Sequence, residues 1–157
     1  AYPAMIELFT RRGDILPPNK KYKALFVDDE LPSLSAILLD DDYYAFLKSG
    51  RRIVDGISVL KPTHLIAFKI KAYLDLSEKK SKGENVDEKN IKKHKNDVFR
   101  LSRLLTGEEG VVADDKILGD VERFFAAIAE EDIDMKQFGV QAAKEEVIDI
   151  IKGAFAI

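Results

Sequence analysis

The sequence predicts an α+β protein, in which a small sheet portion, mixed or antiparallel, is followed by a helical bundle of three to four helices. Two observations lead to this prediction. The first third of the chain holds short apolar runs separated by proline- and glycine-containing turns, a pattern typical of strands. From Pro62 onward, apolar residues recur every three or four positions, as in amphipathic helices. We therefore expect a β-rich portion over residues 1–61 and a C-terminal helical domain over residues 62–157.

Four segments are expected to be strands, because they are short, apolar and bounded by polar or turn-forming residues. These segments are residues 4–9, 23–28, 34–39 and 53–60. The leucines and alanine of the third segment also suit a helix, and Gly56 breaks the fourth segment. After the third segment, a run of aspartates at 40–42 precedes apolar and aromatic residues that end at Gly50, which predicts a short helix. We interpret the aspartates as the cap of this helix rather than as a metal site, because carboxylates are favoured at the positive end of a helix dipole.

The helical part begins at Pro62, which suits the first position of a helix because its missing N–H group needs no partner there. Residues 79–86 are polar, contain a glycine and are expected to form a loop. The apolar spacing predicts helices over residues 62–78, 87–105, 114–129 and 141–154, with a short helical turn over 132–138.

The composition is that of an ordinary globular domain, with 46% hydrophobic and 34% charged residues among 157. Cysteine is absent, which excludes disulfides and thiolate-bound zinc. No apolar run is long enough to cross a bilayer and no secretory signal is visible, so we expect a cytoplasmic protein with no membrane partner.

Charge is distributed unevenly, although the formal net charge is only −3. Residues 1–68 are balanced, residues 69–106 carry +5 and residues 107–157 carry −8. The small net charge does not indicate nucleic-acid binding, which stays possible only through the basic middle of the chain. That segment could face phosphates, or it could oppose the acidic C-terminal segment, and both interpretations stay open.

Lys69 is the most informative residue for function, because it lies in an apolar helical stripe. An ammonium group on a core-facing stripe must extend to water, pair with a carboxylate or meet an anionic ligand. The first two outcomes are structural and the third is functional. At about 100° per residue, Lys69 is expected at the centre of a face formed by six apolar residues. They are Leu65, Ile66, Phe68, Ala72, Tyr73 and Leu76.

Two carboxylates are candidates for a site with Lys69. Asp97 lies at the edge of the apolar stripe of the next helix and would reach Lys69 if the two helices formed an antiparallel hairpin. Glu7 lies in a strand with two apolar faces, where a carboxylate needs a cation, a metal ion or a strong donor. Metal-dependent nucleotidyl transferases place carboxylates on strands in this way. The alternative is a strand end, at which Glu7 reaches solvent or pairs with Arg11 or Arg12.

Short elements of the two central helices carry a resemblance to a known family. They read Leu65-Ile66-x-x-Lys69-x-x-Ala72 and Lys93-His94-x-x-Asp97-Val98. They are similar to the C-terminal part of nucleotidyltransferase-like proteins of the AbiEii abortive-infection toxin type, and the resemblance covers most of residues 1–105. His94 departs from the acidic residue that the family has there and is otherwise expected to be a hydrogen-bonded core residue.

The resemblance implies a core that binds a nucleoside triphosphate with Mg²⁺ and transfers a nucleotide. Glu7, Lys69 and Asp97 would then be catalytic, Glu7 would hold the metal ion, and Lys69 and Lys93 would contact the nucleotide. Residues 1–61 would be the β-rich remnant of this nucleotidyltransferase core. The Gly-Ser helix start and Asp-x-Asp pair of the family are missing, so we expect the chain to be a fragment that is inactive by itself.

Two other interpretations stay open. The chain could be a non-catalytic interaction or regulatory domain, for example one side of a toxin–antitoxin pair. Its acidic residues 107–157 would then face a basic partner, which could be an antitoxin or an upstream part of the same chain. Alternatively, Lys69 and Asp97 form a purely structural ion pair in a scaffold with no further chemistry.

Overall fold

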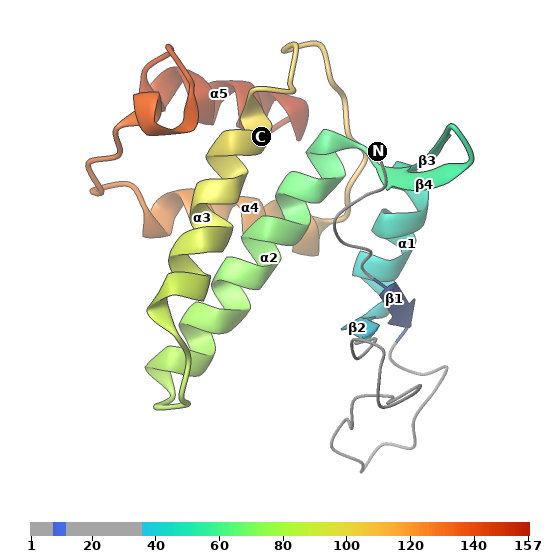
Figure 1. Ribbon diagram of the computed structural model, residues 1–157, viewed down its shortest axis with the longest axis horizontal. Coiled ribbons are helices and arrows are strands. Elements are labelled where there is room, and N and C mark those ends of the chain that lie inside the picture. Colours follow the sequence, from blue (N-terminus) through green and yellow to red (C-terminus); the bar gives the residue numbers. More distant parts are fainter. Residues whose placement is uncertain (1–7, 12–35) are drawn as a thin grey trace. The chain divides into compact units, whose positions relative to one another are not determined.

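The computed structural model describes residues 8–11 and 36–157 (Figure 1). Its short strands followed by a helical bundle confirm the predicted α+β class. The chain separates into two compact units, Ala1–Lys48 and Ser49–Ile157. The second unit contains a β-hairpin as well as the helices that follow it, so the division lies N-terminal to the boundary near residue 61 that the sequence pattern suggested.

The first unit contains a parallel pair of short strands. Strand β1 (Leu8–Arg11) pairs with strand β2 (Ala36–Leu39). These strands overlap the segments predicted over residues 4–9 and 34–39. The strand predicted over residues 23–28 lies outside the described residues.

Helix α1 (Asp41–Gly50) follows β2 and begins with a side-chain cap. The carboxylate of Asp40 accepts a hydrogen bond of 3.0 Å from the backbone N–H of Tyr43. This bond satisfies one of the donors that a helix start leaves without a helical partner. The capping role predicted for the aspartate run is therefore confirmed.

An antiparallel hairpin opens the second unit. Strand β3 (Arg51–Val54) pairs with strand β4 (Ile57–Leu60), and the turn residues Asp55 and Gly56 have φ angles of 50° and 78°. Positive φ at both positions is the geometry of a type I′ turn, which matches the twist of the strands and favours Asp-Gly. The single strand predicted over residues 53–60 is therefore wrong, because this dipeptide divides the segment into two strands.

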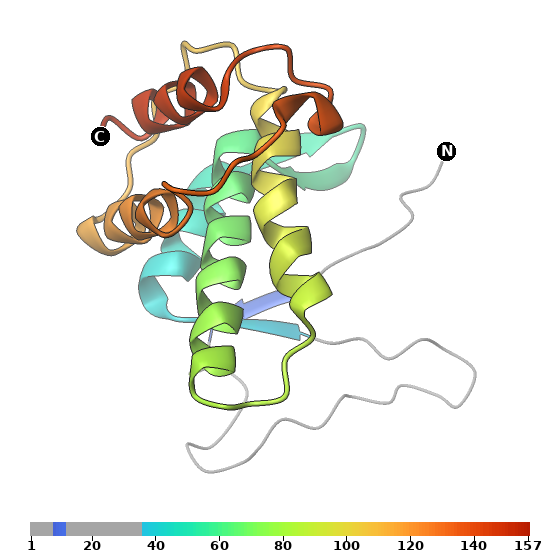
Figure 2. The same ribbon diagram turned by 90° about the vertical axis from the view of Figure 1, so that its left-hand side faces the viewer.

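The helices of the second unit form a bundle. Helices α2 and α3 run antiparallel side by side, and α4 and α5 pack across one side of this pair (Figures 1 and 2). The predicted helices are confirmed, with ends shifted by at most three residues. No helix within residues 8–11 and 36–157 is long and apolar enough to cross a membrane. The elements are α2 (Pro62–Ser81), α3 (Glu88–Ser102), α4 (Asp115–Ala127), the 3₁₀-helix η1 (Met135–Phe138) and α5 (Lys144–Ala154).

Aromatic contacts hold the bundle together. Tyr73 of α2 meets Phe124 of α4 edge to face, with ring centroids 5.1 Å apart. Phe99 of α3 stacks on Phe138 of η1 at 5.6 Å. Such pairs add to the stabilisation that burial alone provides. Seven aliphatic side chains of the bundle also have no exposed surface: Ile66, Ile70, Val98, Ile117, Val121, Ile128 and Ile151.

Aspartate side chains cap three of these helices. Asp87 caps α3, Asp114 caps α4 and Asp134 caps η1, each by accepting a backbone N–H of the first helical turn. These bonds explain why the predicted helix starts were close to correct. They also show that part of the acidic charge of residues 107–157 is structural.

Candidate functional site

Lys69 lies at the edge of the buried face of α2, and its predicted place at the centre of that face is wrong. The buried stripe is centred on Ile66 and Ile70, which have no exposed surface. Lys69 lies to one side of this stripe, and its side chain keeps 20% of its exposure. Three of the predicted stripe neighbours are only partly buried: Leu65, Ala72 and Leu76. The lysine therefore does not enter the core.

Lys69 takes the second of the three expected outcomes, which is pairing with a carboxylate. Its Nζ lies 3.7 Å from Oδ2 of Asp97 on α3, in the antiparallel hairpin that the prediction required. The other carboxylate oxygen of Asp97 accepts a hydrogen bond of 3.0 Å from Arg100. Because the carboxylate is shared and both partners are partly solvated, we expect the Lys69–Asp97 pair to contribute at most about 1 kcal/mol.

The other predicted site residues do not join this pair. Lys93 lies four residues before Asp97 on α3, is exposed, and makes no ion pair within the part of the chain that the structure describes. Glu7, the predicted metal ligand, lies outside the described residues. In residues 8–11 and 36–157, no three Asp, Glu, His or Cys side chains gather as a metal site would require. The described residues therefore form no such cluster around the Lys69–Asp97 pair.

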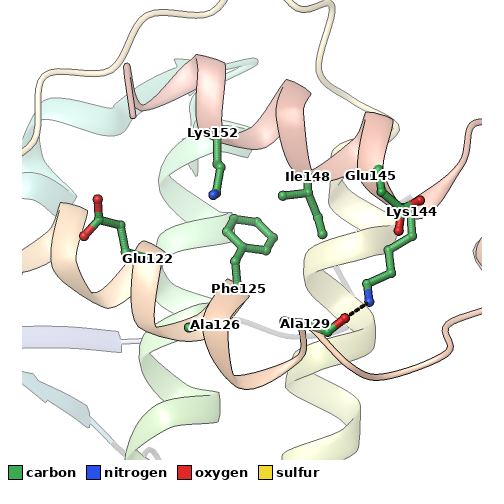
Figure 3. Close-up of a pocket in the computed structure, with 8 residues that line it drawn as sticks. All are labelled: Glu122, Phe125, Ala126, Ala129, Lys144, Glu145, Ile148 and Lys152. Atoms are coloured by element: carbon green, nitrogen blue, oxygen red, sulfur yellow. Dashed lines mark hydrogen bonds between the residues drawn. The ribbon is translucent and has the colours of Figure 1, made fainter.

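A hollow of about 510 Å³ lies between α4 and α5 (Figure 3). We call it the α4–α5 groove. One wall is the second half of α4 and the turn that follows it. The other wall is the side of α5 that carries residues 144, 145, 148 and 152. The lining residues are Glu122, Phe125, Ala126, Ala129, Lys144, Glu145, Ile148 and Lys152.

The floor of the α4–α5 groove is apolar. Phe125 lies near its centre, and Ile148 projects toward it from α5 (Figure 3). Ala126 and Ala129 are both exposed and present only methyl groups. Small side chains at these two positions allow the backbone of an incoming segment to come close to α4. The floor can therefore accept apolar side chains from a second element.

Lys144 joins the start of α5 to the end of α4. Its Nζ donates to the carbonyl oxygens of Ile128 at 3.1 Å, Ala129 at 2.7 Å and Glu131 at 2.7 Å. The end of a helix leaves carbonyl acceptors without helical donors and is the negative end of the helix dipole. The ammonium group of Lys144 therefore connects the start of α5 to the end of α4.

The rim of the groove carries two uncompensated carboxylates. Glu122 and Glu145 are exposed, and neither forms an ion pair in the described part of the chain. Lys152 is placed with its Nζ 5.9 Å from the ring centroid of Phe125, where the face of the ring attracts a cation. The groove therefore offers an apolar floor whose margins carry two carboxylates and two ammonium groups, one of which is bound to helix-end carbonyls.

His64 forms a separate polar cluster at the start of α2. The ring is only 4% exposed, with Nε2 3.1 Å from Oγ of Ser49 and Nδ1 3.2 Å from Oγ1 of Thr63. Burial, together with the nearby charges of Lys61 and Arg52, lowers the pKa of His64 to about 4. The imidazole is therefore neutral near pH 7 and links the end of α1 to α2 as a structural hydrogen-bonding group.

The α4–α5 groove was not predicted from the sequence. A usable signal was present, because Ala126 and Ala129 stand beside Phe125 on a helix that was predicted to be amphipathic. Exposed alanines next to a core phenylalanine leave a hollow unless a neighbour covers them. What could not be anticipated is that α5 borders this hollow without closing it.

Comparisons of the chain with protein-family models, with curated proteins and with solved structures gave no match. The AbiEii-type resemblance therefore rests on the short elements around Lys69 and Asp97 and stays a proposal.

Proposed function

We propose that the second unit is a non-catalytic protein-interaction domain, which binds an amphipathic helical segment with basic side chains in the α4–α5 groove. The observation that carries this proposal is the combination of an apolar floor with two glutamates, Glu122 and Glu145, that have no cationic partner among the described residues. Glutamates beside an apolar groove complement a helix that has one apolar face and basic flanks.

The lining of the groove supports this mode of binding, because it comes from two neighbouring helices. Ala126 and Ala129 are three residues apart and line the same hollow, so a partner helix can approach α4 closely there. Phe125 and Ile148 would then contact the apolar side chains of the partner.

The charge of the surrounding segment supports a basic partner. Residues 107–157 carry a balance of −8, and Lys144, one of the two lysines at the groove, is bound to carbonyl groups. The resulting negative field would speed the approach of a basic segment and would be screened by salt.

The test is a titration with a designed helical peptide that has leucines on one face and lysines on the other. Two matched variants are compared with the wild type. Ala126→Arg fills the floor, whereas Ala127→Arg puts the same side chain on the next exposed position of α4, outside the groove. We expect Ala126→Arg to weaken binding at least about tenfold, which corresponds to about 1.4 kcal/mol, and Ala127→Arg to leave it unchanged within about twofold.

Equal affinity of the peptide for all three proteins would contradict the proposal. Equal binding of a second peptide, in which every lysine is replaced by glutamate, would contradict the assignment of a basic partner.

A nucleotidyltransferase-like activity of a longer parent protein is a second proposal, favoured by one observation. Lys69 and Asp97, which the resemblance assigns to the nucleotide site, lie 3.7 Å apart. A lysine at the phosphates would offset the charge that develops on the leaving pyrophosphate, and the exposed Lys93 would be a further phosphate contact. Bound Mg²⁺ would supply Lewis-acid polarisation of the phosphates, with ligands outside the described residues.

This second proposal is tested by titrating labelled ATP with Mg²⁺ against the wild type and Lys69→Ala. Lys71→Ala is the matched control, because Lys71 lies two residues further along α2 and pairs with Asp75. Selective loss of nucleotide affinity in Lys69→Ala supports the proposal. Equal affinity in all three proteins would end it and would leave the proposal for the α4–α5 groove unaffected.

A further inference from the structure

The β3–β4 hairpin exposes apolar side chains that the helical bundle does not cover. Ile53 is 58% exposed, Val54 51%, Ile57 47% and Val59 39%. The turn of the hairpin extends away from α2 and α3 (Figures 1 and 2). A two-stranded hairpin is marginally stable in water, and an uncovered strand edge is a template for pairing with another strand. This surface is separate from the α4–α5 groove.

The outer edge of β3 carries backbone groups that β4 does not use. Within the described residues β3 pairs with β4 alone. The N–H of Lys61 donates to the carbonyl oxygen of Gly50 at 3.0 Å, so these two residues form a hydrogen-bonded pair at the base of the hairpin. Bonded and non-bonded pairs alternate along an antiparallel ladder. The N–H and C=O groups of Arg51 and Ile53 therefore point outward, away from β4.

The sequence of β3 is complementary to itself when two copies run antiparallel. It reads Arg51-Arg52-Ile53-Val54 and is followed by Asp55. If Ile53 opposes Ile53 of a second copy, Arg51 of each copy extends toward Asp55, the first turn residue of the other. Arg52 is then opposite Val54, which its aliphatic stem can cover. In the same register, the outward N–H group of each Ile53 can donate to the outward C=O group of the other Ile53.

We propose that two copies of this chain dimerise by antiparallel pairing of β3 with β3, centred on Ile53, to form a four-stranded sheet. A register centred on Arg52 is disfavoured, because it would oppose two arginines directly. The edge of β4 is less suitable, because β4 leads directly into Pro62 at the start of α2 and contains no acidic residue. Edge pairing over the strand residues 52–54 is smaller than a standard interface, so the dissociation constant is expected on the order of 10–100 µM.

Disulfide crosslinking tests the register directly, because the chain has no cysteine of its own. Ile53→Cys puts thiols on opposed residues whose Cα atoms would be about 5.5 Å apart, a distance that a disulfide spans. Val59→Cys is the matched control, since Val59 is an exposed β-branched residue of the same hairpin. At about 100 µM protein and mild oxidation, Ile53→Cys should form covalent dimers at least about tenfold faster than Val59→Cys. Equal rates, or a faster rate at Val59, would overturn the proposal.

Sedimentation velocity of the wild type and Asp55→Asn tests the reversible dimer. Asparagine accepts the positive φ of this turn position and Asn-Gly favours a type I′ turn, so the hairpin is retained. Both Arg51–Asp55 pairs are lost, which should raise the dissociation constant of the dimer about three- to tenfold. A dissociation constant that does not change would overturn the proposed register. A wild type that stays monomeric up to about 500 µM would overturn the dimer.

Discussion

At the scale of single residues, Lys69 had the most unusual predicted position, and its partner in the structure is a carboxylate. Lys69 pairs with Asp97, which also accepts a hydrogen bond from Arg100. Both members of the Lys69–Asp97 pair keep about a fifth of their exposure, so Lys69 does not require an anionic ligand. His64 is more tightly constrained, because its ring is buried and both ring nitrogens have hydroxyl neighbours.

The burial of His64 predicts a loss of stability in acid. Its pKa is about 4 in the folded protein against an ordinary value of 6.5, so the unfolded chain binds the proton more readily. The contribution of the neutral ring is complete above pH 6.5 and is lost as the pH falls through 4. We expect the free energy of unfolding to fall by roughly 2–3 kcal/mol between pH 7 and pH 4 from this residue.

Urea denaturation across this pH range measures the effect. His64→Asn removes the titrating ring and leaves the carboxylates unchanged, so the difference between the two pH profiles isolates the histidine. Two parallel profiles would show that His64 does not titrate as described.

Gly50 and Gly119 are predicted to respond in opposite ways to alanine. A Cβ at Gly50 would lie 2.2 Å from Cγ and Cδ2 of His64, so the buried ring would have to move. We expect Gly50→Ala to destabilise the protein by about 2–4 kcal/mol. Gly119 lies within α4 with no atom within 4 Å of an added Cβ, so Gly119→Ala should stabilise by about 0.5–1 kcal/mol. Thermal unfolding of the two variants checks this order, and an equal effect would contradict it.

At the scale of elements, the connection between α4 and α5 depends on Lys144. Lys144→Met removes three hydrogen bonds to carbonyl groups at the end of α4. We expect a loss of about 1–2 kcal/mol, together with faster hydrogen exchange in α5. Lys152→Met is the control, because Lys152 contacts only a ring face at the groove, 5.9 Å from the centroid of Phe125, and should change stability by less than about 1 kcal/mol. Equal losses in the two variants would argue against Lys144 as the link.

The helices could be predicted from the sequence because their signals are local. Apolar spacing and the capping residues Asp87 and Asp114 located their starts, and both caps are present. The hairpin was missed because Gly56 was taken as a break within one strand rather than as half of an Asp-Gly turn. The buried faces were less predictable: Ile150 continues the apolar spacing of α5 but is 39% exposed. Which side of a helix is covered depends on its neighbours, and these are not fixed by its own residues.

At the scale of the whole molecule, the two candidate sites differ in how far the sequence could predict them. The contact between Lys69 and Asp97 follows from two adjacent helices joined by a short loop, so the sequence predicted it. The α4–α5 groove brings residues 122–129 together with residues 144–152 across an intervening turn and η1. Each helix was predicted, but their spacing is set by the packing of both on α2 and α3, which no local pattern contains.

The most direct test of binding at the α4–α5 groove is an amide chemical-shift map of the isotope-labelled chain, recorded as the leucine–lysine peptide is added. The account predicts that the largest changes fall in residues 122–129 and 144–152, and that Lys69, Lys93 and Asp97 stay unchanged. A map whose maximum lies on α2 and α3, or one spread evenly over the acidic surface with no maximum at the groove, would contradict it.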